Sequence, residues 1–308
     1  MGSVLSGFAT IAIIIGVGAL LAHLGVLDLA AQKVLANVAF TVATPALLLT
    51  TIAGTDVRVL LSHNLITSAA SAVVAGGLYA VVARLAWRRT SGDLAIGAAT
   101  SAYVNSANLG IPVAAYVLGN AALVAPTLLL QLLVIQPIML AVLDAERSGR
   151  RPSPWSLVRT TLTNPVTAGT LIGLALSLTG WSLPNWLGTP LQLIGAIAIP
   201  GMLLAYGVAL RLGPGLGGDL PKPELALTTA LKLVGQPVVA YAVAHFLLGV
   251  TGPALLAIVV IAALPTAQNI FIIATRYDRS TVLARDTILL TTLGSMPVIL
   301  AITLLLGH

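Results

Sequence analysis

The sequence predicts an all-α polytopic membrane protein, with ten transmembrane helices arranged as two inverted five-helix repeats. The 308 residues are 58% hydrophobic and only 8% charged, and the mean hydropathy is +1.03. Soluble domains carry about 25% charged residues, so this composition excludes one. The apolar residues fall into runs long enough to cross a bilayer, and two of these runs carry a polar interruption at related places in the two halves of the chain.

Ten apolar runs of roughly 20 residues can each span a hydrocarbon core of about 30 Å. They fall at 4–22, 34–53, 64–86, 94–119, 123–143, 163–180, 186–210, 225–249, 254–275 and 285–306. We therefore divide the chain into a first five-helix repeat (1–144), a basic cytoplasmic connection (145–160) and a second, inverted repeat (161–308). The segment Met1–Phe8 has no Lys or Arg, so the first run is interpreted as a retained helix and not a cleaved signal peptide.

The distribution of basic residues predicts the orientation of the helices. If the connection between spans five and six is cytoplasmic, only Arg58 lies outside. The inside set is Lys33, Arg84, Arg88, Arg89, Arg147, Arg150, Arg151, Arg159, Arg211, Lys222, Lys232, Arg276, Arg279 and Arg285. Such a bias follows the positive-inside rule, so we expect a multi-pass protein of the cell (plasma) membrane with both termini outside. It also explains the net charge of +6 without nucleic acid as a partner.

Weak internal similarity indicates the repeat. Gln136–Ala141 matches Met296–Ala301 at an offset of 160, and Asn108 matches Asn269 at 161. A near-constant offset in the same order indicates that five spans were duplicated. Because five is odd, the two copies must be inverted in the membrane.

Two interruptions form the centre of the predicted site. Tyr103–Pro112 interrupts span four, and Ala263–Asn269 interrupts span nine. In hydrocarbon an unpaired backbone amide costs several kcal/mol, so a helix breaks only beside protein or a cavity. Matching broken helices in two halves are the best sequence pointer to a transporter's binding site.

The depth of both interruptions follows from helical rise. Asp93 to Asn105 and Pro253 to Pro265 each span 12 residues, about 18 Å at 1.5 Å per residue. The first helix enters from the cytoplasm and the second from outside. We therefore expect helices 4 and 9 to be broken and to cross at the midplane.

The predicted substrate-binding residues supply amides, hydroxyls and helix-breaking backbone. Prolines remove a donor and disfavour helix before them, and Gly110 permits backbone conformations that other residues resist. The helices that resume after each break expose N–H groups and a positive dipole end, which suit an anion. The set is Asn105, Asn108, Gly110, Pro112, Pro265, Thr266, Gln268 and Asn269, with Thr44 and Tyr206 as candidates for the scaffold side. The alternative is that the amides only bond across helices and the prolines only kink them.

Other polar residues define what the site lacks. The chain has no cysteine, and we expect every Asp and Glu to lie at helix ends or in loops, which argues against a carboxylate-lined sodium site or proton relay. Lys232 could meet an anion from the cytoplasm, but the favoured reading is that it snorkels to the interface. Arg84, Arg88 and Arg89 are expected to face lipid. Gly169-x-x-x-Gly173 permits close helix packing. No catalytic set, metal site or cofactor site is predicted, so an enzyme is not expected.

Several short motifs resemble the auxin efflux carrier family and its bacterial relatives. They are Asn105, Gly110-Ile111-Pro112, Ala263-Leu264-Pro265 followed by Phe271, Ala274 and Tyr277, and Asn164-Pro165 followed by Leu171-Ile172-Gly173-Leu174. The resemblance implies a scaffold of spans 1, 2, 6 and 7, often dimeric, and a transport domain of the other six spans that moves as an elevator. It also implies organic-acid substrates such as malate or malonate. The chain lacks the large hydrophilic loop of the plant carriers, which argues against auxin itself.

The sequence thus predicts a secondary transporter that exports or exchanges small organic anions, held where helices 4 and 9 cross. The expected partners are the anion, the lipid bilayer and a second copy of the chain. The alternative is a sodium-coupled organic-anion symporter of the bile-acid-carrier type, which has the same crossover design. The absence of an acidic residue before Gln268-Asn269 argues against the alternative.

Overall fold

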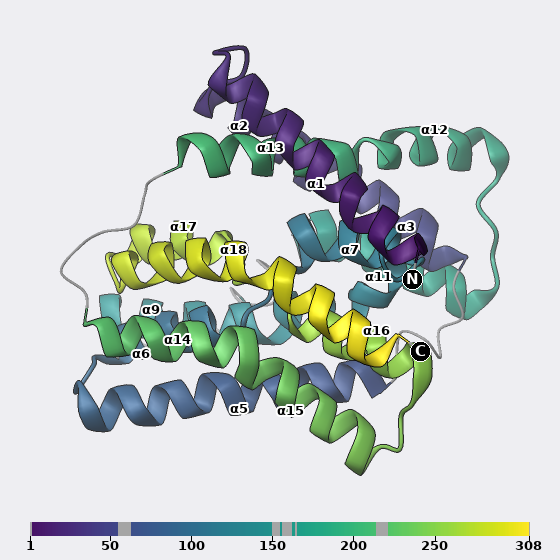
Figure 1. Ribbon diagram of the computed structural model, residues 1–308. Coiled ribbons are helices and arrows are strands. Elements are labelled where there is room, and N and C mark those ends of the chain that lie inside the picture. The colour runs from purple at the N-terminus through teal and green to yellow at the C-terminus, as the bar shows by residue number, and fades with distance from the viewer. Residues whose placement is uncertain are drawn as a thin grey trace. The chain divides into compact units, whose positions relative to one another are not determined.

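The computed structural model describes residues 2–54, 63–149, 155, 162–163, 165–213 and 221–307 (Figure 1). Helices make up all of the regular secondary structure of these residues, and among them there is no strand beyond one isolated β-bridge. Six helical stretches are long and apolar enough to cross a membrane: 29–53, 63–86, 121–147, 185–212, 222–247 and 281–306. Shorter apolar helices occupy 9–23, 165–179 and 252–262. The protein is therefore a multi-pass membrane protein, while its arrangement as ten helices in inverted repeats stays a prediction.

The chain forms two compact units that each draw on both halves of the sequence. Unit 1 comprises 1–62, 107–129 and 160–213, and unit 2 comprises 63–106, 130–159 and 214–308. The four spans expected to form a scaffold all contribute to unit 1, together with residues 107–129. This division into units does not test the predicted repeat boundaries at 144 and 161. Most of the connection between those boundaries lies outside the described residues.

The helices of each unit, including π and 3-10 segments (η), have the following bounds. Unit 1 contains α1 (Gly2–His23), α2 (Leu29–Val38), η1 (Ala39–Ala43), α3 (Thr44–Ala53), most of η2 (Ser106–Gly110), α7 (Ile111–Tyr116), η3 (Ala121–Val124), most of α8 (Ala125–Leu130), α11 (Pro165–Thr179), α12 (Asn185–Ala196) and α13 (Ala198–Leu212). Unit 2 contains α5 (His63–Ala86), α6 (Ser91–Ala102), η4 (Gln131–Ile135), α9 (Gln136–Ser148), α14 (Lys222–Ala230), η5 (Leu231–Gly235), α15 (Gln236–Ala242), η6 (Val243–Leu247), α16 (Gly252–Ala262), α17 (Asn269–Tyr277) and α18 (Thr281–Leu306).

In unit 1, α1 and α13 cross in close contact through glycines (Figure 1). A Cβ added to Gly207 would lie 2.1 Å from the carbonyl oxygen of Ile15. A Cβ on Gly18 would lie 2.4 Å from the carbonyl oxygen of Leu204. Both contacts are far inside van der Waals distance, so the backbones can approach this closely only because glycine occupies both positions.

A second close contact joins α11 to α3. A Cβ on Gly169 would lie 2.6 Å from the carbonyl oxygen of Pro45, and one on Gly173 would lie 2.8 Å from that of Leu49. The Gly-x-x-x-Gly pattern therefore packs spans six and two together inside unit 1, and the predicted close packing is confirmed.

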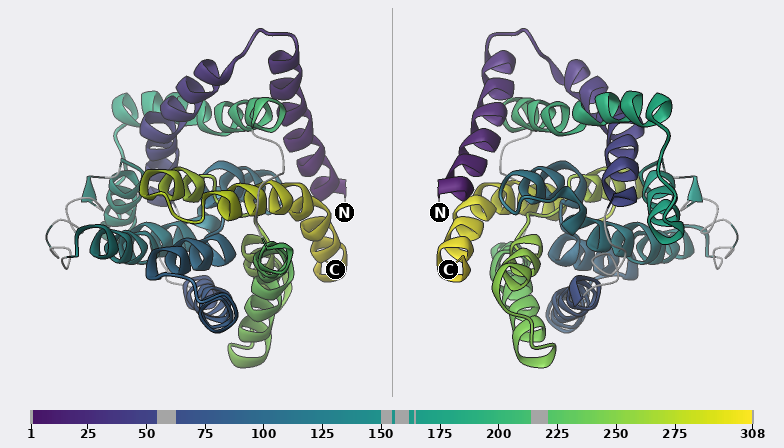
Figure 2. Two further views of the ribbon diagram at one scale, coloured as in Figure 1. Left: turned by 90° about the vertical axis from the view of Figure 1, so that its left-hand side faces the viewer. Right: turned by 90° about the vertical axis from the view of Figure 1, so that its right-hand side faces the viewer.

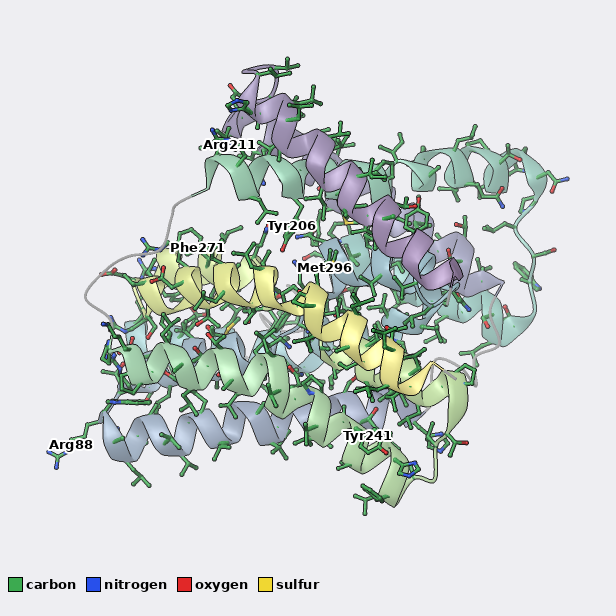
Figure 3. The ribbon with its side chains drawn as sticks, in the orientation of Figure 1. Arg88, Tyr206, Arg211, Tyr241, Phe271 and Met296 are labelled. Atoms are coloured by element: carbon green, nitrogen blue, oxygen red, sulfur yellow. The ribbon has the colours of Figure 1, made fainter. Side chains whose placement is uncertain are left out.

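Two helix connections in unit 1 are fixed by polar contacts. Figure 2 shows α1 and α2 diverging from the turn between them, where the Asp28 carboxylate accepts a 2.7 Å hydrogen bond from the N–H of Ala31 and caps α2. At the end of α13, Arg211 lies close to the end of α1, with 3.1 Å between its Nη2 and His23 Nδ1 (Figure 3).

Four π segments precede prolines in the same register. η1, η2, η4 and η5 end two residues before Pro45, Pro112, Pro137 and Pro237, respectively. A proline has no N–H, and its ring clashes with the carbonyl four residues earlier, so the preceding turn widens. Helices therefore continue through these prolines with a local bulge and without a break.

Unit 2 is built on a small-residue contact between α5 and α6. The ring of Tyr79 fills the space beside Gly97, where a Cβ would lie 2.1 Å from the tyrosine Cε1 atom. A buried apolar cluster that includes Ile96, Tyr103, Leu143 and Ile270 joins α6 to α9 and α17. These contacts hold both interrupted helices in one packed body.

An ion pair between Arg89 and Glu224 in unit 2 corrects the prediction that Arg89 faces lipid. The fully buried Glu224 carboxylate accepts hydrogen bonds from Tyr79 OH at 2.8 Å and Arg89 Nε at 3.0 Å, and it pairs with Arg89 Nη2. Arg89 therefore binds a carboxylate and does not face lipid, because that acid would otherwise be buried without a counter-charge. Arg88, two residues after the end of α5, is exposed and projects away from unit 2 (Figure 3), and its predicted contact with lipid stays a prediction.

Candidate functional site

The first interruption lies slightly upstream of its predicted centre. α6 ends at Ala102, and Tyr103 adopts extended backbone with φ −86° and ψ 104°. Helix resumes at Ser106 as η2, and Gly110 has ordinary right-handed helical angles of −64° and −44°. The prediction that Gly110 supplies unusual backbone freedom is therefore wrong, because the π segment before Pro112 absorbs the strain instead.

The second interruption pairs with the first inside unit 2. α16 ends at Ala262 and α17 begins at Asn269. Val104 of the first interruption and Thr266 of the second form an antiparallel β-bridge. The N–H of Asn105 donates to the carbonyl of Pro265 at 2.7 Å, and the N–H of Ala267 donates to the carbonyl of Tyr103 at 3.1 Å. The two non-helical stretches thus satisfy part of each other's backbone, as a bilayer environment demands.

Two side chains donate hydrogen bonds to carbonyls at the C-terminal end of α6, one from the second interruption and one from α15. Thr266 Oγ1 donates to the carbonyl of Thr100 at 2.6 Å, and Gln236 Nε2 donates to that of Ala102 at 2.9 Å. The last carbonyls of a helix have no partner within it, so these bonds replace the missing turn. The N–H of Thr266 donates in turn to Thr291 Oγ1 at 3.2 Å.

Gln131 binds the non-helical stretch that follows α6. Its Nε2 donates to the carbonyl of Val104 at 2.9 Å, and its Oε1 accepts from Ser106 Oγ at 2.9 Å. All three residues are at most 3% exposed. This one side chain therefore pairs the backbone of the break and the first residue of the resumed helix.

An amide cluster lies beside the start of α17. Tyr103 OH donates to Gln136 Oε1 at 3.1 Å, and Asn269 Nδ2 lies 3.5 Å from the same oxygen. Asn269 Oδ1 is buried and accepts no hydrogen bond from any described residue. The neighbouring side chain of Gln268 is half-buried. Buried polar atoms are nearly always paired, so this corner has capacity for a ligand.

The predicted site residues divide between the two units. Asn105, Pro265, Thr266, Gln268 and Asn269 come together in unit 2. The others, Asn108, Gly110, Pro112, Thr44 and Tyr206, belong to unit 1.

Within unit 1, the two scaffold-side candidates lie in the packed interior. Thr44 is fully buried, and its Oγ1 lies 3.9 Å from Met202 Sδ. Tyr206 is 4% exposed on α13 (Figure 3).

Several residues of the crossing were not anticipated. Gln131, Gln136, Gln236 and Thr291 all bond to the crossing or beside it. Gln136 and Gln236 each precede a proline at the end of a π segment, and a glutamine in an apolar run is costly unless paired. A glutamine directly before a proline in an apolar run was therefore the sequence signal that could have identified Gln136 and Gln236.

The prediction that Lys232 snorkels to the membrane interface is wrong. Lys232 is completely buried in η5, and its Nζ donates to Gln236 Oε1. It therefore does not snorkel to an interface. Two acidic residues placed at helix ends are buried too: Glu224, described above, and Asp286, which is 4% exposed and pairs with Arg285 at 2.7 Å. Among the described residues no group of His, Cys, Asp and Glu has the makings of a metal site.

These features define a class of protein. Interrupted helices that pair through a buried polar crossing inside a multi-pass membrane protein are typical of secondary transporters. The chain belongs to the membrane transport protein family, the family of the auxin efflux carriers, whose model matches residues 3–154 and 142–303. The resemblance drawn from the short motifs is thereby confirmed, and the family indicates a membrane transporter.

A curated relative covers most of the chain. It is a Rhizobium meliloti (strain 1021) protein described as "Putative malonate transporter", 28% identical over 261 residues. The match covers 82% of this chain and 80% of the relative.

Proposed function

We propose that the protein is a secondary carrier that exports or exchanges small organic anions such as dicarboxylates, bound where the two interrupted segments cross in unit 2. The observation that carries this proposal is the pairing of Asn105 with Pro265 and of Ala267 with Tyr103. It places Gln268 and Asn269 at the start of α17, beside a buried polar corner.

The chemistry of this corner suits a carboxylate. The positive dipole end of α17 and the neutral amides of Gln268 and Asn269 attract an anion without the cost of burying a charged side chain beside it. Asn269 Oδ1 can accept from a protonated acid or a hydroxyl of the same ligand. The relative is named as a putative malonate transporter, and we extend dicarboxylates to this chain as a substrate class that the helix dipole and the amide N–H groups would attract.

The wider mechanism follows the predicted topology. We infer ten spans in two inverted repeats, with spans 1, 2, 6 and 7 as a scaffold, in a homodimer, and the other six as the moving part of an elevator. A membrane potential of 100 mV is worth about 2.3 kcal/mol per charge, so a dianion gains about 4.6 kcal/mol on leaving a negative interior. Export therefore needs no coupled ion.

Counter-flow in proteoliposomes tests the proposal. Purified protein is reconstituted in vesicles loaded with unlabelled malonate, and uptake of labelled malonate is measured against a panel of mono- and dicarboxylates, with sodium and with choline. We expect dicarboxylates to drive the accumulation of labelled malonate in the vesicles, both with sodium and with choline. The sodium-coupled symporter predicts accumulation in sodium alone, and no accumulation with any carboxylate would refute the proposed function.

A further inference from the structure

We propose that a groove on unit 2 binds an anionic phospholipid, with the phosphate at Lys222 and one acyl chain along the groove. The groove has a volume of about 370 Å³. Its walls come from α14 and η5, between Lys222 and Val234, and from Leu290 of α18. None of these residues belongs to the crossing, so the inference goes beyond the proposed function and does not depend on it.

The groove follows one face of a continuous helix. Its lining positions in α14 and η5 recur at intervals of three residues and one residue from 222 to 234, a spacing that keeps side chains on one side of a helix. Ala226 and Ala230 lie in the middle of this face and are exposed. Their small side chains leave a hollow between the larger Leu225 and Leu233. In unit 2, α14 runs beside α18, which contributes Leu290 to the other wall (Figure 1).

The length of the groove matches one leaflet of a bilayer. Lys222 is the first residue of the apolar stretch 222–247, which is long enough to cross a membrane. From Lys222 to Val234 the helix rises about 18 Å at 1.5 Å per residue. The hydrocarbon core is about 30 Å thick, so one leaflet takes up about 15 Å of it. The groove therefore runs from the edge of the span to about its middle, which is the extent of one acyl chain.

The charge at the mouth of the groove favours an anionic headgroup. Lys222 is exposed and forms no ion pair with another described residue. It also begins α14, where the helix dipole is positive. The acids nearby in the sequence and on α18 do not oppose an anion, because Glu224 pairs with Arg89 and Asp286 pairs with Arg285. A lysine at the edge of an apolar span attracts the phosphate of an anionic lipid.

Thr229 adds a hydroxyl to the wall of the groove. Its Oγ1 is buried and has no hydrogen-bond partner among the described residues, although an unpaired buried hydroxyl is costly. Thr229 lies about 10 Å along the helix axis from Lys222, on the side of the ester groups of a lipid whose phosphate is at Lys222. Threonine in a helix uses two χ1 rotamers, so a rotation presents this hydroxyl to an ester carbonyl.

The melting temperature of delipidated protein in detergent tests the site. It is measured with dioleoylphosphatidylglycerol, which is anionic, with dioleoylphosphatidylcholine, which is zwitterionic, and with inorganic phosphate. Lys222→Ala removes the charge, and Ala226→Phe fills the groove from an exposed position, so the packed interior is not disturbed. Ala230→Phe, one turn further on, is a second groove-filling variant. The matched controls are Lys33→Ala, at an exposed lysine on α2, and Ala301→Phe, at an exposed alanine of α18 outside the groove.

We expect phosphatidylglycerol to raise the melting temperature of the wild type by about 2–4 °C more than phosphatidylcholine does, and inorganic phosphate to leave it unchanged. The difference between the two lipids should disappear in Lys222→Ala and in the groove-filling variants, and both controls should match the wild type. Equal effects of the two lipids on the wild type, or a difference that persists in Lys222→Ala or in the groove-filling variants, would overturn the inference.

A protein helix is the competing occupant of the groove. In that case the groove-filling variants would change the oligomeric mass of the protein in detergent, and the two lipids would have equal effects on the wild type. None of these measurements needs a substrate, so their outcome is independent of whether the vesicles show transport.

Discussion

The backbone N–H of Asn105 donates to the carbonyl of Pro265 at 2.7 Å, joining the two interrupted helices of the chain. The β-bridge at this point is isolated, so two backbone bonds alone connect the stretches. The remaining polar groups of the crossing rely on side chains from surrounding helices. The stability of the crossing should therefore depend on individual glutamines and threonines.

Replacing Gln131 by Leu should destabilise unit 2. The change leaves the buried hydroxyl of Ser106 without its acceptor, at a cost of about 1–3 kcal/mol, and removes one of the two donors to the carbonyl of Val104, which keeps the N–H of Ser106 at 2.8 Å. Thermal unfolding in detergent should show a clear drop in melting temperature. Gln192→Leu on the exposed face of α12 is the control, and equal melting temperatures for the two variants would contradict this account.

The contact of α1 with α13 should be intolerant of a single methyl group. Gly207→Ala places a Cβ 2.1 Å from the carbonyl oxygen of Ile15, so the helices must separate. Overpacking of this kind costs about 1–3 kcal/mol. The melting temperature and the yield of monodisperse protein should both fall.

Gly16→Ala, on α1, provides the opposite expectation. A Cβ there meets nothing within 4 Å, and alanine favours helix over glycine by up to about 1 kcal/mol. This variant should be as stable as the wild type or slightly more so. If both glycine variants behaved alike, the close approach of the two helices would be wrong.

A third prediction concerns the buried carboxylate of Glu224, in the first turn of α14. Tyr79→Phe removes the 2.8 Å hydrogen bond to Glu224 and should cost about 1 kcal/mol. Glu224→Leu should cost more, because it strips Arg89 of its partner. Tyr116→Phe, at a partly exposed tyrosine, is the control, and chemical denaturation in detergent is the measurement.

The Arg89–Glu224 ion pair also predicts how the stability of the fold depends on alkaline pH. The hydrogen bond to Glu224 raises the pKa of the Arg89 guanidinium. A raised pKa means that this contribution to stability is complete below the unfolded pKa of arginine and is lost only as pH rises through the higher folded value. Between pH 8 and about 10 the stability difference between wild type and Glu224→Leu should therefore stay constant. A difference that shrinks over that range would rule out the guanidinium as the titrating partner.

Local sequence patterns predicted the parts of the fold that depend on local physics. Polar residues and proline in apolar runs placed both interruptions, and Gly169-x-x-x-Gly173 placed a close helix contact. The centre of the first break was misplaced because a proline after a π segment can continue a helix, as Pro112 does.

The sequence could not show which side chains complete the crossing. Gln131, Gln236 and Thr291 come from three other helices, and tertiary packing alone brings them to the breaks. The same holds for Lys232, since a lysine eight residues into an apolar span fits either snorkelling or burial until its neighbours are known. The candidate amides of the site could be named from the sequence, but not their partners.

The central claim is that the crossing binds the carboxylate, and the substrate affinity of Asn269→Ala tests it most directly. Malonate counter-flow is measured over a range of concentrations for the wild type, Asn269→Ala and Asn185→Ala, an exposed asparagine at the start of α12. We predict that the half-saturating malonate concentration rises about tenfold or more for Asn269→Ala, since one lost hydrogen bond is worth about 1.4 kcal/mol, and stays at the wild-type value for Asn185→Ala. Unchanged half-saturation in a folded Asn269→Ala protein would contradict the placement of the substrate at the crossing.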